Sequence, residues 1–318
     1  MHGMLDMLKR REFLKELGSS GMAMGLASCS HIHLPREKVK DDNLGADEKV
    51  QATATTINKS HETLIATAPM VYTAVPKEET KPILRVKNFN TTFDDDLFLE
   101  PKKIKLLKSV SHKLVLVKNY VGFGHFNLIS FDEMIAIGKN YRKLAQFTKD
   151  ELDFLDEVFH FNAAQYGFYG DKVLDQMTAK ISIRDVCKVP HTGHYIYKSE
   201  AYALYLKIQR EIGPSIILTS GVRGIVKQMQ LFLAKAIRVK ANMSKASRSL
   251  APPGHSYHGI GDFDVGKVGF GIGNFTSRFA KTDEYKKLIA SGYINIRYTE
   301  NNPFGVRYEP WHIKVAKG

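Results

Sequence analysis

Cysteine and tryptophan are the scarcest residues in this chain, whose 318 residues include two cysteines and one tryptophan. The two cysteines, Cys29 and Cys187, supply no zinc-finger spacing, so a structural zinc finger is excluded. The sequence also lacks an HExxH motif, which excludes a thermolysin-like metallopeptidase site. The apolar run near its N-terminus is too short to form a stable transmembrane helix.

Acidic residues are also few, with 33 Asp and Glu against 46 Lys and Arg, which gives a formal net charge of +13. Such an excess favours an anionic partner, either a nucleic acid or an anionic envelope surface. No helix-turn-helix signature and no aromatic-laced basic ribonucleoprotein motif occurs, so we expect no nucleic-acid partner. A hydrophobic fraction of 43% is ordinary for a protein with a folded core.

The N-terminus has the layout of a secretory signal: a basic region, a weakly apolar region and a small-residue site. Its "RREFLK" segment, with Arg10 and Arg11, resembles the twin-arginine export signal. "LASC" at residues 26–29 resembles a bacterial lipobox, with Cys29 as the acylated residue. The alternative is an amphipathic helix with a chance arginine pair. We therefore predict an exported protein, lipid-anchored at the periplasmic face of the cell envelope.

Composition predicts four parts of the chain. Residues 1–29 are the export signal with its lipobox, and the polar residues 30–82 are typical of a flexible tether. Residues 83–190 are predicted to be a mostly helical accessory region, with helices after Ser130 and Thr148. Within it, residues 112–126 show strand-like alternation broken by glycines. Residues 191–318 are predicted to be the catalytic domain.

The catalytic part has the pattern of an α+β domain, a small antiparallel sheet with flanking helices. A helix runs from Ser199 to a stop at Gly213, a strand leads into Gly221, and a second helix covers residues 227–243. Residues 283–298 are predicted to be a helix that passes into a strand, and residues 307–316 a terminal strand.

The potential metal ligands of this part lie in two short segments. "SYHGIGDFDVG" holds His258, Asp262 and Asp264, and "EPWH" ends the set with Glu309 and His312. A catalytic zinc site needs three protein ligands, an open position for water and a carboxylate that takes the proton of that water. If residues 262–264 form a strand, both aspartates face the same side. Pro310 argues against a regular ladder, and a turn there brings Glu309 and His312 inward.

A candidate cation lies upstream of these segments in the sequence. Arg223 follows the end of a predicted strand in "TSGVRG", where it could polarise a substrate carbonyl or bind a carboxylate.

Residues 219–315 resemble the zinc D-alanyl-D-alanine carboxypeptidases of the VanY type. The shared motifs, in the family's order, are "SGxR" (Ser220, Gly221, Arg223), a glutamine five residues later (Gln228), "SxHxxG" (Ser256, His258, Gly261) and "EPWH" (Glu309 to His312). The resemblance implies a D-Ala-D-Ala carboxypeptidase/hedgehog-like zinc peptidase fold and a peptidoglycan peptide substrate. It implies Zn²⁺ on His258, an aspartate and His312, with Glu309 as base and Arg223 at the developing oxyanion. Ser256 and Gln228 are the candidate substrate-binding residues.

Two positions depart from the family pattern. Gly224 replaces a serine, and Val265 stands where the family has its ligand aspartate, seven residues after the histidine. Asp264 is one residue early and Asp262 three residues early. A one-residue deletion between Gly261 and Asp264 would restore the pattern. We therefore predict Asp264 as the ligand, keep Asp262 as the alternative, and expect the other carboxylate to orient a neighbour.

The sequence thus predicts a monomeric zinc metallopeptidase that cleaves peptidoglycan stem peptides, most simply a D-alanyl-D-alanine carboxypeptidase. Two alternatives stay open: an endopeptidase of the same family, and a non-catalytic peptidoglycan-binding lipoprotein that retains the fold. His191 and His194 in "HTGH" have no carboxylate or cysteine at metal spacing. We interpret that segment as a loop that enters a helix.

Overall fold

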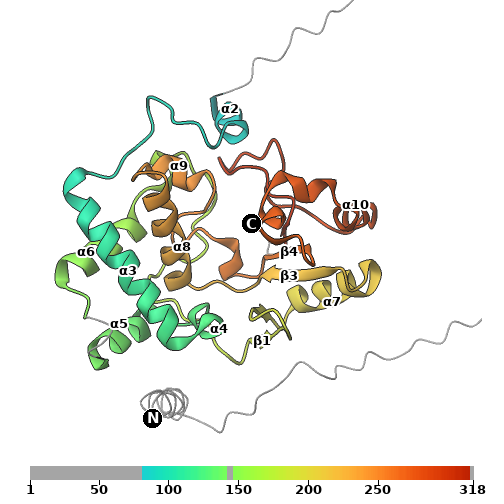
Figure 1. The fold of residues 1–318 in the computed structure, drawn as a ribbon, viewed down its shortest axis with the longest axis horizontal. Coiled ribbons are helices and arrows are strands. Elements are labelled where there is room, and N and C mark those ends of the chain that lie inside the picture. Colours follow the sequence, from blue (N-terminus) through green and yellow to red (C-terminus); the bar gives the residue numbers. More distant parts are fainter. Residues whose placement is uncertain (1–80, 142–145, 316–318) are drawn as a thin grey trace, which may run out of the picture. The chain divides into compact units, whose positions relative to one another are not determined.

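The computed structural model describes residues 81–141 and 146–315. Within these residues the chain has two kinds of architecture. Helices alone occur up to residue 166, and strands and helices alternate after residue 186 (Figure 1). The predicted export signal, the lipidation site Cys29 and the tether up to residue 80 lie outside the described residues. None of the described helices combines the length and hydropathy needed to cross a membrane.

The first part is built from short and medium helices. Two of them, α5 and α6, begin with complete capping boxes at Ser130 and Thr148, so both predicted starts are confirmed. The helices are α2 (Lys81–Lys87), η1 (Pro101–Lys103), α3 (Ile104–Val121), α4 (Phe123–Phe126), α5 (Phe131–Asn140), α6 (Lys149–His160) and η3 (Ala163–Tyr166).

The prediction of a strand within residues 112–126 is wrong, because this segment belongs to helices α3 (Ile104–Val121) and α4 (Phe123–Phe126). The β-branched valines of α3 suggested alternation, but burial along the helix follows a spacing of three to four residues. The buried positions are Leu107, Val110, Ser111, Leu114, Val117 and Val121. That spacing places them on one face of a helix, where packing outweighs the weak strand preference of valine.

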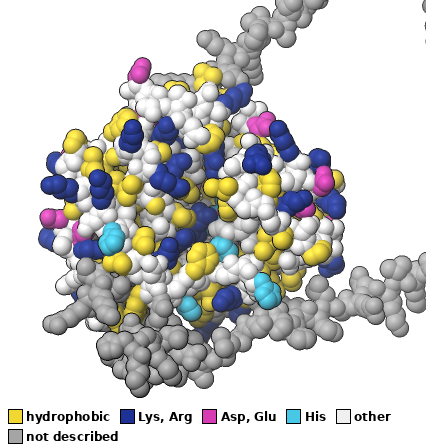
Figure 2. Space-filling view, in the orientation of Figure 1, with side chains coloured by type: hydrophobic (Ala, Val, Ile, Leu, Met, Phe, Trp, Pro, Cys, Tyr) yellow, Lys and Arg dark blue, Asp and Glu magenta, His cyan; other side chains and the backbone are white. Residues whose placement is uncertain are grey.

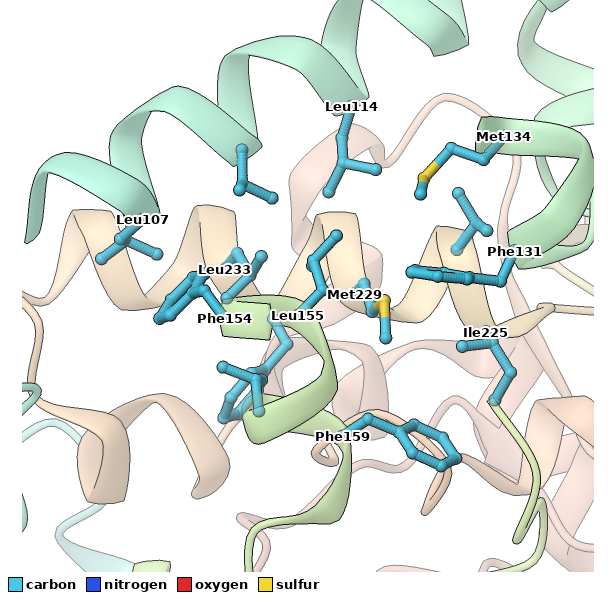
Figure 3. Packing of buried hydrophobic residues seen from close by; sticks show 14 of the residues in the cluster. Leu107, Leu114, Phe131, Met134, Phe154, Leu155, Phe159, Ile225, Met229 and Leu233 are labelled. Carbon is cyan, nitrogen blue, oxygen red and sulfur yellow. The ribbon is translucent and has the colours of Figure 1, made fainter. Parts of the chain in front are cut away.

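These helices share a hydrophobic core with a helix from the second part of the chain. Ile225, Met229 and Leu233 of α8 (Ile225–Arg238) are buried against α3, α5 and α6 (Figure 3). Their spacing of four residues forms one apolar stripe along α8. The burial of this face of α8 therefore depends on helices that lie before residue 161. The boundary at residue 190 stays a prediction.

A buried ion pair ties the segment before α3 to α9 (Met243–Ser247). Arg248 donates to both carboxylate oxygens of Asp96, at 2.7 and 2.9 Å, and to the carbonyl of Thr91 at 2.8 Å. Asn242 donates a further hydrogen bond to Asp96. Despite burial, these donors lower the pKa of Asp96 to about 2.

The second part has a hairpin and a three-stranded sheet. Its elements are β1 (Val186–Lys188), β2 (Tyr195–Tyr197), α7 (Glu200–Ile212), β3 (Ile216–Ser220), α8, α9, η4 (Tyr257–Gly259), β4 (Phe263–Lys267), η5 (Gly271–Phe275), η6 (Ser277–Lys281), α10 (Asp283–Ala290) and β5 (His312–Ile313). The strands of the larger sheet are antiparallel in the order β3-β4-β5. The predicted α+β class with a mostly helical N-terminal region is confirmed.

Three local expectations in this part need correction. His191 and His194 lie in the turn of the β1–β2 hairpin, so they do not enter a helix directly. The strand expected at the end of residues 283–298 is reduced to an isolated bridge between Ile296 and Ile313. The terminal strand is only the two residues of β5, because the turn at Pro310 delays its start.

Candidate metal centre

Three buried side chains from separate elements bring one ligand atom each to a common point. His258 lies in η4, Asp264 in β4 and His312 in β5, and the three ligand atoms lie within 4.8 Å of one another. Among the residues that the structure describes, these are the group with the spacing that a metal ion requires. They are the ligands predicted from the sequence, with Asp264 in the group and Asp262 outside it.

The tautomer of His258 is set by a backbone carbonyl. Its Nδ1 lies 2.8 Å from the carbonyl oxygen of Gly221, which can only accept a hydrogen bond. The proton of the neutral ring therefore sits on Nδ1, and Nε2 carries the lone pair. Nε2 lies 3.3 Å from Oδ1 of Asp264, on the side of the common point.

His312 is oriented in the same way, by a carboxylate. Its Nε2 lies 3.0 Å from Oδ2 of Asp262, and its Nδ1 lies 3.3 Å from Oδ1 of Asp264. Asp262 also accepts hydrogen bonds from the backbone N–H of Val315, at 2.8 Å, and from the guanidinium of Arg297. Asp262 therefore lies behind His312 and directs the Nδ1 lone pair toward the common point.

The chemistry of these atoms fits a divalent cation. Oδ1 of Asp264 is buried and receives no hydrogen bond from any described residue. The two nearest ring nitrogens carry lone pairs in the tautomers argued above, so three electron-pair donors face one another. Such an arrangement is repulsive unless a cation or a proton lies between them. Two imidazole nitrogens and one carboxylate oxygen form a donor set typical of zinc.

Without such a cation, a proton takes over part of its role. Burial disfavours the imidazolium form of His312, but its hydrogen bond with Asp262 and the nearby negative charge of Asp264 outweigh this effect and raise its pKa to about 9. A metal ion must displace that proton, so metal binding releases a proton near neutral pH.

The strand register places Asp264 beside His312. Ser220 of β3, Asp264 of β4 and His312 of β5 form one row across the sheet. Between Leu218 and Ser220 the register shifts, so Thr219 is an extra residue in β3 with no partner in β4. This bulge absorbs a one-residue difference between the two strands. A count along the sequence alone cannot detect it.

Glu309 lies beside the metal-ligand group, at the turn that precedes β5. Its Oε2 is 3.7 Å from Nδ1 of His312, and its Oε1 is 3.4 Å from Nε of Arg307. The turn is closed by a hydrogen bond from the His312 N–H to the Glu309 carbonyl. Burial raises the pKa of the Glu309 carboxyl, although Arg307 and His312 oppose the shift. A buried carboxylate with a raised pKa suits a general base.

Arg223 is directed toward the group by several acceptors. Its guanidinium donates to Ser220 Oγ at 3.0 Å and to Gln228 Oε1 at 3.2 Å, and it lies 3.1 Å from His258 Nε2. Gln228 also donates to the carbonyl of Ala251, so it ties Arg223 to the loop before η4. The arginine therefore lies at the edge of the metal-ligand group with its donors facing that group.

Gly221 allows this turn to pack against the β1–β2 hairpin. A Cβ atom at this position would lie 1.9 Å from the carbonyl oxygen of Tyr195, which itself accepts from the N–H of Val222 at 2.7 Å. Only glycine permits so close an approach of the two backbones. The hairpin and the turn that carries Arg223 are thereby held together.

Ser256 begins η4 and is buried, and its carbonyl accepts from the N–H of Gly259 at 3.0 Å. Its role in substrate binding stays a prediction. The sequence reasoning missed Arg297, whose buried guanidinium pairs with Asp262 and lies 3.5 Å from the ring centroid of Tyr257. An arginine within the apolar segment "YINIRY" was the available signal, because a buried arginine needs an acidic partner.

A protein-family model covers the segment that contains this centre. Residues 196–316 match the family model of VanY, a D-alanyl-D-alanine carboxypeptidase. A search among curated proteins finds no match. The matched segment contains all the predicted catalytic, metal-binding and substrate-binding residues: Arg223, Gln228, Ser256, His258, Asp262, Asp264, Glu309 and His312.

Several solved structures resemble part of the chain. A variant of the vancomycin resistance D,D-pentapeptidase VanY from a VanB-type cassette, in complex with Zn(II), is 25% identical, with a TM-score of 0.31, over 41% of this chain and 76% of that one. VanYB in complex with D-alanine-D-alanine is 24% identical, with a TM-score of 0.33, over 43% and 78%. The LD-carboxypeptidase LdcB, whose structure concerns peptidoglycan recognition, is 24% identical, with a TM-score of 0.33, over 40% and 62%.

Proposed function

We propose that this protein is a zinc-dependent peptidase of peptidoglycan stem peptides, with the D-alanyl-D-alanine bond as its first candidate substrate. The observation that carries the proposal is the convergence of His258, Asp264 and His312 beside a buried carboxylate, Glu309. The match of residues 196–316 to the VanY family model supports the peptide bond as the target.

Zinc would be held by Nε2 of His258, a carboxylate oxygen of Asp264 and Nδ1 of His312. When bound there, it supplies a Lewis acid that polarises the carbonyl and makes water more acidic. Two protein nitrogens and one oxygen leave a coordination position for water or substrate, as catalytic zinc sites require.

The remaining chemistry belongs to side chains of this protein. Glu309 takes a proton from the attacking water, whose oxygen bonds to the carbonyl carbon. It then returns the proton to the amine nitrogen as the C–N bond breaks. Arg223 directs its N–H donors at the developing oxyanion, which is where fixed positive charge lowers the barrier most. Gln228 and Ser220 keep the guanidinium in place through their hydrogen bonds.

We also propose that the enzyme acts outside the cytoplasm, lipid-anchored through Cys29 at the periplasmic face of the envelope. The twin-arginine-like and lipobox-like segments support this location, and the net charge of +13 suits an anionic envelope. A Cys29→Ala variant should lose membrane association in a cell fractionation, whereas association retained by that variant would contradict the lipid anchor.

The decisive experiment compares wild type with Glu309→Ala for zinc content and for release of D-alanine from a pentapeptide muropeptide. We expect stoichiometric zinc in both proteins and release by wild type alone. Cleavage at another bond in whole sacculi would identify an endopeptidase. Stoichiometric zinc without any cleavage would instead indicate a peptidoglycan-binding lipoprotein, and absence of zinc from wild type would refute the metal centre.

A further inference from the structure

Beside the metal centre lies a group of positive and aromatic side chains that the proposed reaction does not use. Lys227 is half-buried in the first turn of α8, and Phe123 of α4 and His194 of the β1–β2 hairpin lie around it. The Lys227 Nζ is 5.6 Å from the ring centroid of Phe123 and 5.8 Å from that of Phe126. The rings of Phe123 and His194 meet edge to face at 5.0 Å.

No carboxylate of the described residues forms an ion pair with the ammonium of this group. The hydrogen-bond acceptor of the Lys227 ammonium is the neutral side chain of Gln230, at 3.3 Å, and no described carboxylate lies within ion-pair distance. The first turn of α8 also contains no acidic residue. Burial and the charges of Arg223 and Lys118 lower the pKa of Lys227 to about 8, so the group still carries its charge at neutral pH.

His194 adds a second unsatisfied polar group. Its Nδ1 is buried and has no hydrogen-bond partner among the described residues. Burial, with Arg223 and Lys227 nearby, lowers the pKa of His194 to about 4, so the ring is neutral and does not add to the repulsion. A half-buried ammonium without a carboxylate carries a desolvation cost that an incoming anion would offset, and the tautomer of His194 with its proton on Nδ1 can donate a hydrogen bond to the same anion.

We propose that Lys227, with His194 and Phe123, forms a subsite for a side-chain carboxylate of the peptide substrate, separate from the carbonyl at Arg223. Aromatic walls around the ammonium exclude water, which strengthens its attraction for a carboxylate. His194 and Phe123 lie before residue 196, outside the segment that matches the family model. The residues before the matched segment thus contribute to substrate choice. This inference rests on the proposed peptidase function.

Figure 2 shows the charge distribution on one face of the molecule. Lys and Arg side chains are spread over that face, in its middle and at its edges, and Asp and Glu side chains are fewer and lie mostly toward its margins (Figure 2). A peptide with free side-chain carboxylates would therefore meet little electrostatic repulsion on its approach.

The test uses two acetylated pentapeptides that end in D-alanyl-D-alanine and differ at the preceding residue, which carries either a free carboxylate or the carboxamide. For wild type we expect a KM about tenfold lower for the carboxylate peptide, with a similar kcat, as one charge-assisted pair provides. Lys227→Gln should abolish this preference, and Lys227→Arg should largely restore it. Lys286→Gln, on the exposed surface of α10, removes a lysine elsewhere and should keep the preference.

Equal KM values for the two peptides in wild type, or an unchanged preference in Lys227→Gln, would overturn the proposal. If no peptide is cleaved, binding of the same pair is followed through the fluorescence of Trp311. A tenfold difference in Kd that Lys227→Gln removes would then support the subsite while contradicting the peptidase function. Equal Kd values would contradict the subsite as well.

Discussion

Asp264 of β4 and Asp262, which directly precedes that strand, should differ in their effect on zinc binding, although both contact His312. In Asp264→Asn a ligand oxygen of the centre is lost, and we expect no stoichiometric zinc at concentrations that saturate wild type. In Asp262→Asn the three ligand atoms remain, but Nε2 of His312 loses its anionic acceptor at 3.0 Å. Loss of such an outer partner weakens zinc affinity roughly 10- to 100-fold.

The expected change for Asp262→Asn corresponds to about 1.4–2.7 kcal/mol of binding free energy. The asparagine keeps one oxygen that can accept from Val315 N–H or Arg297, so the variant loses charge but little shape. A folding cost of about 1–3 kcal/mol is expected because the buried Arg297 loses its ion pair. The assay therefore needs conditions in which far-UV circular dichroism matches that of wild type.

The measurement is a zinc titration in competition with a chromophoric chelator. Asp283→Asn, an exposed aspartate on α10, serves as the matched control and should bind zinc like wild type. Stoichiometric zinc in Asp264→Asn together with loss in Asp262→Asn would refute the assignment of the two aspartates. Equal affinities of wild type and Asp262→Asn would show that the His312 orientation does not depend on Asp262.

Four further predictions concern stability and the metal. Because the pKa of Asp96 is lowered to about 2, its ionised carboxylate adds roughly 2 kcal/mol to the free energy of unfolding at pH values above its ordinary pKa. This contribution is lost as the pH falls toward 2. The free energies of unfolding of wild type and Asp96→Asn, measured in urea, should therefore converge at low pH. Arg248→Ala leaves the Asp96 carboxylate buried and should cost about 3–5 kcal/mol in the same assay near neutral pH. Gly221→Ala forces the backbones of residues 221 and 195 apart, so calorimetry should show a lower Tm and a loss of about 1–3 kcal/mol in stability. A separate assay should show weaker activity. Removal of zinc by a chelator should lower Tm reversibly, because zinc at 100-fold above Kd raises the free energy of unfolding by about 2.7 kcal/mol. An unchanged Tm would contradict tight binding to the folded state.

Short motifs predicted much of the candidate site, because their residues are local in sequence and their chemistry is distinctive. "EPWH" predicted both Glu309 and His312, and the turn at Pro310 does bring these two side chains together. The choice between Asp262 and Asp264 depended on a strand register. The pairing of Asp264 with His312 between β4 and β5 decides it, and a pairing between strands this far apart in the chain leaves no reliable trace in a single sequence.

Long-range partners were harder to predict than local ones. Arg297 meets Asp262 at a sequence separation of 35, and nothing local to either residue specifies the pair. The α3 helix was mistaken for a strand because its valines resemble a β pattern when the core that buries them is not known. Capping boxes at Ser130 and Thr148 were recognisable because both halves of each box lie within four residues.

The packing of α8 links the chemistry of the centre to the stability of the helical part. The N-terminal end of this helix holds Gln228, which positions Arg223, while its apolar stripe lies in the core formed by α3, α5 and α6. A chain cut to the family-matched residues 196–316 would expose that stripe to water. It should therefore aggregate or lose the arginine's alignment. Substitutions at the interface of α3 and α8, outside the metal-ligand group, should in this way disturb the candidate site without touching any of its ligands.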